Sequence, residues 1–177
     1  DTLRPDAKSL IDALLAQGLS VELLSGDQPS VVARVANELG IAEFTASATP
    51  SDKLSQVKKR QAEGDKVLMI GDGINDVPVL SGADVSIAMA SASDLAQTRA
   101  DALLLNNHLM VVADAILIAR ETKRVIQQNL RFSLTYNALA VPLAAAGFVA
   151  PWLAAIGMTL SSLIVILSNL IHLSFLR

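Results

Sequence analysis

The stretch Gly71-Asp-Gly-Ile-Asn-Asp-Val-Pro78 places acidic and amide side chains in a glycine-rich segment, directly after the apolar run Val67–Ile70. Hard oxygen ligands in a loop of this kind suit Mg²⁺, and Mg²⁺ in turn suits phosphate. Asp72 and Asp76 are separated by four positions, so one carboxylate can bind the metal while the other braces the loop. The alternative is a loop with a purely structural role. We expect a magnesium site here.

Two further polar groups suit the same chemistry. Ser25-Gly-Asp27 follows the predicted strand Val21-Glu-Leu-Leu24, and a hydroxyl with exposed backbone N–H groups after a strand can hold phosphate oxygens. Lys53 lies at the start of a helical segment, where a lysine can neutralise a phosphoryl group beside the helix N-terminus. Taken singly, Ser25–Asp27 is equally a turn, and most lysines are solvated. The order of the three groups along the chain is what predicts a phosphate site.

The elements that position these groups alternate between strand and helix. Such alternation predicts an α/β fold with a doubly wound parallel sheet and right-handed crossovers. Chemistry in these sheets lies at the carboxyl ends of the strands. The predicted strands are Val21–Leu24, Lys66–Ile70, Val85–Met89 and Ala102–Leu105; the predicted helices are Asp6–Gln17, Gln28–Leu39, Ser51–Ala62 (N-cap Ser51), Asp76–Ser81 and Leu95–Arg99, with a longer helix from about Leu109 to Pro142.

Charge divides the 177-residue chain into two parts. Residues 1–121 contain all 17 acidic residues and carry a net charge of −7, whereas residues 122–177 carry +4. The 45 residues from Phe132 to Leu176 contain no Asp, Glu, Lys or Arg. This division excludes intrinsic disorder, a nucleic-acid binder driven by net charge and an ordinary one-piece soluble domain. The absence of cysteine excludes a disulfide framework, a cysteine zinc site and a thiol nucleophile within this sequence.

The uncharged tail is long enough for two bilayer crossings, at about 1.5 Å per helical residue and about 30 Å of hydrocarbon. Gly147–Pro151 interrupts it, which gives candidate spans at Leu130–Phe148 and Trp152–Leu173. Basic residues flank both outer ends, and this pattern predicts that both ends are cytoplasmic. The alternative is a buried helical hairpin in a large soluble core. Asn137 and Asn169 inside the spans are expected to face protein or a transport pathway, and helix–helix contact is the alternative role for the polar residues of the spans.

With these motifs in order, the first part of the chain resembles the phosphorylation domain of P-type ATPases, a member of the haloacid dehalogenase superfamily. The matching stretches are Asp1-Thr-Leu-Arg-Pro5, Ser25-Gly-Asp27, Pro50-Ser-Asp-Lys53 and Gly71–Leu80. The resemblance implies that Asp72 coordinates Mg²⁺, with Asn75 and Asp76 completing the site. The implied catalytic residues are Lys53, Ser25, Asp27, Asp72 and Asp76, and the implied phosphate- and nucleotide-binding residues are Ser25, Gly26, Asp27, Lys53 and Asn75.

The tail resembles the copper(I) branch of the heavy-metal P-type ATPases. Tyr136-Asn137 and Met158-Thr-Leu-Ser-Ser162 match that branch, with Thr159 in place of its first Ser. The resemblance implies that Tyr136, Asn137, Met158 and Ser162 bind copper(I). The chemistry agrees, because a thioether is a soft ligand that favours this ion.

The family's phosphorylated Asp lies in an Asp-Lys-Thr-Gly motif, which this sequence lacks, as it lacks the Cys-Pro-Cys motif. We therefore expect the C-terminal part of an ATP-driven copper(I) or silver(I) pump that uses Mg²⁺ and is inactive as this fragment alone. The expected organisation is part of the phosphorylation domain at 1–108, a connecting helix at 109–129 and the last two transmembrane helices at 130–177.

The resemblance also implies a setting and partners. We expect an integral protein of a bacterial inner membrane, with the soluble part in the cytoplasm. Its partners are copper(I), ATP, the lipid bilayer, the N-terminal domains of the same polypeptide and a copper chaperone, with no nucleic acid. The alternatives are a membrane-tethered phosphatase of the haloacid dehalogenase type, a P-type ATPase for another heavy metal, and a non-catalytic fragment that binds a membrane partner.

Overall fold

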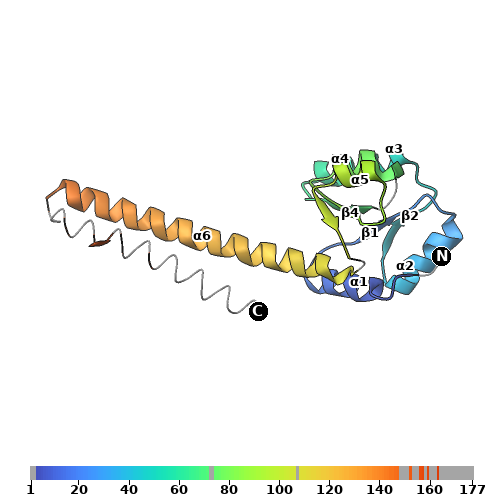
Figure 1. Ribbon diagram of the computed structural model, residues 1–177, viewed down its shortest axis with the longest axis horizontal. Coiled ribbons are helices and arrows are strands. Elements are labelled where there is room, and N and C mark those ends of the chain that lie inside the picture. Colours follow the sequence, from blue (N-terminus) through green and yellow to red (C-terminus); the bar gives the residue numbers. More distant parts are fainter. Residues whose placement is uncertain are drawn as a thin grey trace. The chain divides into compact units, whose positions relative to one another are not determined.

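The structure is a computed structural model that describes residues 3–71, 74–106 and 108–147, together with residues 152, 156, 157, 159 and 163. The chain divides into two compact units, residues 1–113 and residues 114–177. The boundary falls inside the longest helix, α6 (Met110–Ala145). The first unit carries the α/β elements (Figure 1).

Among the described residues of the first unit, five parallel strands form two sheets. In one, β1 (Glu22–Leu24) pairs with β2 (Glu43–Thr45); in the other, β4 (Val85–Met89) lies between β3 (Leu68–Gly71) and β5 (Ala102–Leu104). The predicted parallel α/β arrangement is confirmed, although the strands form two sheets where one was expected. The strand β2 was not predicted, because Glu43-Phe-Thr45 is short and mostly exposed and so carries no buried apolar pattern.

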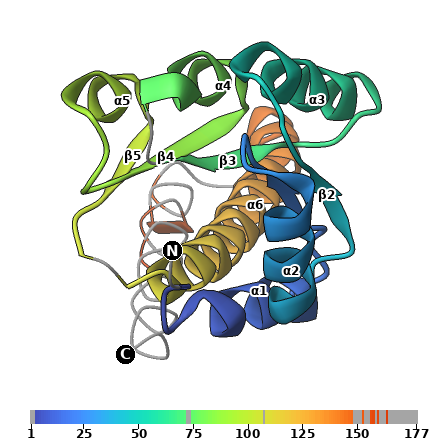
Figure 2. The ribbon, with the colours of Figure 1, turned by 90° about the vertical axis from the view of Figure 1, so that its right-hand side faces the viewer.

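Helices cover both sides of the strands, as a doubly wound fold requires. The helices α3 (Pro50–Ala62), α4 (Val77–Gly82) and α5 (Asp94–Arg99) lie together on one side, and α1 (Ala7–Ala16) and α2 (Pro29–Leu39) lie on the other (Figures 1 and 2). A 3₁₀ helix, Ile74–Asp76, precedes α4. One core cluster centres on Ile11, Ala36, Leu39 and Ile41, and a second on Leu80, Ala88, Ala92 and Ala96.

The start of α3 differs from the prediction. Its N-cap is Thr49, not Ser51, and Thr49 forms a capping box with Asp52. The Thr49 hydroxyl accepts from the Asp52 N–H at 3.2 Å, while the Asp52 carboxylate accepts from the Thr49 N–H at 2.9 Å. Pro50 has a fixed φ and no N–H, which suits it to the first helical position, so the cap falls one residue before it.

The helix α6 continues through Pro142 to Ala145, which confirms a long helix that begins near Leu109. Its 36 residues correspond to about 54 Å of helix. Gly147, with φ 77°, follows the end of the helix, at the predicted interruption. Among the described residues, none of the helices combines the length and the apolar character needed to cross a membrane. Most of the candidate span Trp152–Leu173 lies outside the described residues, and both spans stay predictions.

Candidate phosphate and metal sites

The structure brings two of the predicted site residues into direct contact. Lys53 lies in the first turns of α3, and Asp76 lies in the 3₁₀ helix that follows β3. The Lys53 ammonium donates to Asp76 Oδ1 at 2.7 Å, with the two side chains 14% and 11% exposed. Both charges are therefore largely withdrawn from water and depend on each other. The pair joins α3 to the carboxyl end of β3, where chemistry was expected.

Gly71, the last residue of β3, makes room for this ion pair. A Cβ atom at position 71 would lie 3.1 Å from Asp76 Cβ and 3.2 Å from Asp76 Oδ2. Contacts this short are tighter than ordinary van der Waals packing, so only glycine leaves the Asp76 carboxylate undisturbed against the strand end. Gly71 acts through this close approach, since its φ is not in the left-handed region.

The predicted Ser25 loop is closed by its own hydrogen bonds. The Ser25 hydroxyl donates to Asp27 Oδ2 at 3.0 Å and accepts from the Asp27 N–H at 3.2 Å. The Asp27 carbonyl accepts from the Ser47 N–H, and the Ser25 carbonyl accepts from the Ala48 N–H, each at 2.9 Å. Ser25 and Asp27 thus form one unit after β1. Among the described residues, no hydrogen bond joins this loop to Lys53 or Asp76.

The predicted Mg²⁺ ligands are only partly described. Asp72 lies outside the described residues, Asn75 is exposed, and Asp76 is buried and paired with Lys53. The described residues contain no cluster of three His, Cys, Asp or Glu side chains that could hold a metal. Carboxylate and amide oxygens are nevertheless the donors that Mg²⁺ prefers, so Asn75 and Asp76 fit it chemically. The contact described for Asp76 is with Lys53, and the division of metal-binding and bracing roles between Asp72 and Asp76 stays a prediction.

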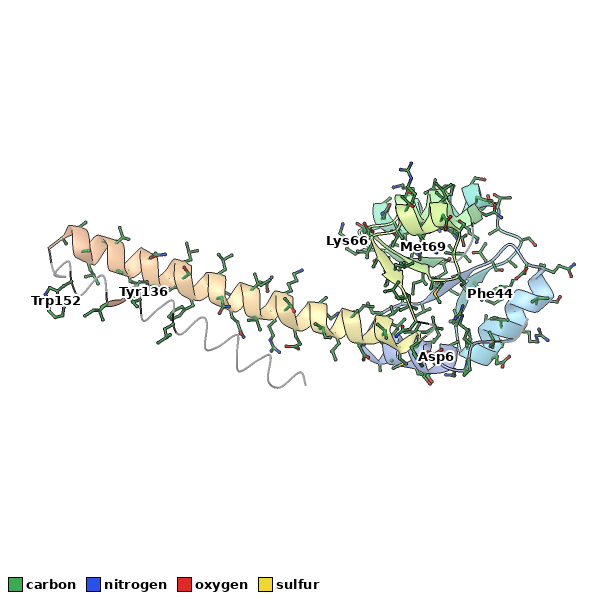
Figure 3. All side chains as sticks on the ribbon, viewed as in Figure 1. Asp6, Phe44, Lys66, Met69, Tyr136 and Trp152 are labelled. Carbon is green, nitrogen blue, oxygen red and sulfur yellow. The ribbon has the colours of Figure 1, made fainter. Side chains whose placement is uncertain are left out.

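In the second unit, the predicted copper ligands Tyr136 and Asn137 lie on α6, half-buried and exposed respectively (Figure 3 labels Tyr136). Met158 and Ser162 lie outside the described residues. A Cβ atom at Gly157 would overlap the Tyr136 hydroxyl oxygen and lie 3.5 Å from Tyr136 Cζ. The phenol therefore reaches the backbone directly before residue 158. Gly157 was missed from the sequence, although a glycine beside a candidate ligand is itself a signal of close approach.

A second polar cluster braces the amino ends of the strands. Asp84 accepts from Lys66 Nζ at 2.8 Å, from Gln61 Nε2 at 2.9 Å and from the Val67 N–H at 3.1 Å. The hydrogen bond from Lys66, followed by those from Val67 and Gln61, holds the pKa of the Asp84 carboxyl well below its usual range. The cluster lies at the end of β3 and β4 away from the Gly71 loop, so its role is structural. Two surface hollows of about 350 and 430 Å³ also contain none of the predicted site residues.

Sequence comparison finds two matching family models, both described as haloacid dehalogenase-like hydrolase, over residues 1–84 and 53–116. A probable cation-transporting ATPase of Haemophilus influenzae is 45% identical over 96% of this chain and 24% of its own length. The nitrogen fixation protein FixI of Rhizobium leguminosarum is 44% identical over 96% of this chain and 22% of its own length. The copper-exporting P-type ATPase of Bacillus subtilis is 39% identical over 96% of this chain and 21% of its own length.

Solved structures give a consistent result. A zinc-transporting PIB-type ATPase in its E2.Pi state matches 100% of this chain and 28% of that chain, with a TM-score of 0.89 and 37% identity. The catalytic CPx-ATPase domain CopB-B matches 66% of this chain and 47% of that chain, with a TM-score of 0.61 and 38% identity. A deoxy-D-mannose-octulosonate 8-phosphate phosphatase from Haemophilus influenzae covers 68% of this chain and 74% of that chain at a TM-score of 0.60, but its 21% identity shows the fold alone.

The α/β unit is therefore a haloacid dehalogenase-like domain. The chain that contains it is similar over nearly its whole length to P-type ATPases that transport metal cations, and it spans about a quarter of the length of the curated relatives it matches.

Proposed function

We propose that the chain is part of an ATP-driven copper(I) or silver(I) transporter whose aspartyl phosphate forms on a residue outside this sequence. The observation that carries the proposal is the 2.7 Å ion pair between Lys53 and Asp76 at the carboxyl end of β3. It fixes a lysine ammonium beside the loop that begins at Gly71. The relatives named as copper-exporting P-type ATPases support the choice of cargo.

In this proposal the residues of the first unit hold the phosphoryl group. The Lys53 ammonium has three donors and needs only one for Asp76, so it can donate to a phosphoryl oxygen as well. The Ser25 hydroxyl and the Gly26 N–H would donate to the same group, with Asp27 orienting the Ser25 hydroxyl through the hydrogen bond already described. Asp27 would also help to position the nucleotide. Preorganised donors of this kind are the main means by which phosphoryl transfer is accelerated.

Asp72 is the proposed Mg²⁺ ligand, with Asn75 and Asp76 completing the site. When bound, Mg²⁺ neutralises the negative charge of the phosphoryl oxygens. The chain's own contribution is to hold Asp76 in place, which it does through Lys53 and through the space left by Gly71. ATP and the remaining domains of the same polypeptide are the proposed partners, and a copper chaperone is a further one.

The second unit is proposed to provide half of a metal pathway. Tyr136 and Asn137 on α6 would act with Met158 and Ser162, and the thioether of Met158 would favour copper(I) or silver(I) over zinc(II). The close approach of Tyr136 to Gly157 supports the meeting of these two segments. In this proposal residues 1–108 belong to the phosphorylation domain, 109–129 connect, and 130–177 form two membrane helices of a bacterial inner membrane.

The phosphoryl site is tested in the full-length protein by labelling with radioactive ATP. The Asp72→Ala variant is expected to lose Mg²⁺-dependent phosphoenzyme formation, because the metal would lack its carboxylate. Asp65→Ala, an exposed acidic residue in the turn after α3, serves as the matched control and is expected to label normally. Normal labelling of Asp72→Ala would refute its metal role.

The cargo is tested by ATP hydrolysis of the same protein with copper(I), silver(I) or zinc(II). We expect stimulation by copper(I) and silver(I), and its loss in Met158→Leu with phosphorylation by inorganic phosphate retained. Met110→Leu, at the start of α6, is the control for the same chemical change elsewhere. Stimulation by zinc(II) alone, or unchanged copper(I) stimulation in Met158→Leu, would contradict the assignment.

A further inference from the structure

The two ends of α1 are hydrogen-bonded to the beginning of α6, far away in the sequence. Asp6, directly before α1, accepts from the Leu109 N–H through its carboxylate at 2.6 Å. Gln17, directly after α1, donates through Nε2 to the Ala113 carbonyl at 3.2 Å. Both contacts are partly buried, and Ala113 is only 2% exposed. The first turn of α6 is therefore an integral part of the α/β unit (Figure 3 labels Asp6).

The orientation of Asp6 is unusual for its position. An aspartate at a helix N-cap normally accepts from a backbone N–H of its own helix. Asp6 is the N-cap of α1, yet its side chain makes no such bond. Its carboxylate instead accepts at the start of α6, where unpaired N–H groups and the helix dipole favour an anion. The Asp6 side chain therefore bonds to a residue 103 positions away in the sequence and does not cap its own helix.

The helix α1 shares a core cluster with the strand that leads to the Ser25 loop. Ile11 belongs to the core cluster against which Ala7, Val21 and Leu23 pack, and Leu23 lies in β1. The Ser25 loop begins directly after β1. The loop is thus connected through β1, the shared core cluster and α1 to the first turn of α6. Coupling between sites is carried by packed and hydrogen-bonded contacts of this kind.

We propose that Asp6 and Gln17 are positioning residues that tie the first turn of α6 to α1, so that a displacement of the Ser25 loop on phosphorylation moves α6. The inference rests on the proposed function and names the two side chains through which the phosphate site acts on the helix. Neither side chain belongs to the proposed phosphate site, since Asp6 bonds to Leu109 and Gln17 to Ala113. Their loss should therefore spare phosphorylation and impair the metal-coupled steps that follow it.

The test uses the full-length ATPase with Asp6→Ala, Gln17→Ala and the double variant. Two quantities are measured: the amount of phosphoenzyme formed from ATP, and copper(I)-stimulated ATP turnover. Asp6→Ala is expected to keep phosphoenzyme within about twofold of wild type and to lower turnover about tenfold, the factor that loss of one charge-assisted hydrogen bond corresponds to. Asp6→Asn retains an acceptor oxygen and should restore most of the turnover.

The matched control is Asp12→Ala on the same helix. Asp12 is 57% exposed and pairs only along α1, with Lys8, so both quantities should stay at wild-type values. If Asp6→Ala and Gln17→Ala both behave like Asp12→Ala, the inference is wrong while the proposed function stands. An equal fall of phosphoenzyme and turnover in Gln17→Ala and Asp6→Asn also overturns it, because the residues would then act on folding or on the site. A wild-type protein without copper(I)-stimulated turnover removes the proposed function, and the inference with it.

Discussion

The ion pair between Lys53 and Asp76 should contribute measurably to folding, apart from any role in phosphoryl transfer. An exposed ion pair is worth about 0–1 kcal/mol, and removing one partner of a buried pair costs about 3–5 kcal/mol. With side chains 14% and 11% exposed at 2.7 Å, this pair lies near the buried limit. We expect Lys53→Met and Asp76→Asn each to lower the free energy of unfolding by about 2–3 kcal/mol.

A double-mutant cycle measures the coupling. In Lys53→Met/Asp76→Asn neither side chain is left with an unpaired charge, so the double variant should be about 2 kcal/mol more stable than the sum of the single effects predicts. Urea unfolding without Mg²⁺ or phosphate is followed by far-ultraviolet circular dichroism, to which the helices α1–α5 of the α/β unit contribute together with α6. Trp152 is the only tryptophan of the sequence and belongs to the second unit, so its fluorescence does not report on the α/β unit. If the effect of the double substitution on the free energy of unfolding equals the sum of the two single effects within about 0.5 kcal/mol, the two residues are not coupled and the reasoning is refuted.

Three further predictions concern single contacts. Thr49→Ala should lower the free energy of unfolding by about 1 kcal/mol in urea unfolding, because it removes the capping box of α3, whereas Ser51→Ala should change it by less than about 0.5 kcal/mol. Asp84→Asn should be destabilising at neutral pH, and the difference from wild type should begin to shrink as pH falls below about 4, since a carboxyl whose folded pKa is depressed gradually loses its contribution as the pH approaches that folded pKa; a difference that is as large at pH 2 as at pH 7 would contradict this. Gly157→Ala should destabilise the second unit by about 1–3 kcal/mol, because the new methyl group would meet the Tyr136 hydroxyl. The unfolding is measured by Trp152 fluorescence, and the loss of stability should be smaller in a Tyr136→Phe background, which lacks that hydroxyl.

Most of the secondary structure of the α/β unit could be predicted from its residue types. Apolar runs and glycine or polar breaks located four of the five strands, and Val85–Met89 agrees residue for residue. Lys53 and Asp76 were recognised as members of one site from their chemistry and their places after predicted elements. Their direct contact could not be predicted, because it depends on the packing of α3 against α4 and on the space at Gly71.

The misses have local causes. Thr49 and Ser51 are both good caps, and the decision between them depends on Pro50 and on the reciprocal bond from Asp52. The long-range bond from Asp6 to Leu109 has no local signature, since an aspartate before a helix predicts a cap of that helix. Contacts between residues that are distant in sequence depend on the fold as a whole. Hydrophobic periodicity and secondary-structure propensity describe short stretches of sequence and do not predict such contacts.

The division of the strands into two sheets bears on how this stretch behaves when it is produced by itself. In the described part of the chain, β4 alone has a neighbouring strand on each side, so β1, β2, β3 and β5 each present one open row of backbone N–H and C=O groups. Open rows of this kind are templates for pairing with another molecule, although strands of three or four residues limit how strongly they pair. We expect the isolated chain to self-associate as its concentration rises, so that solubility would limit its yield.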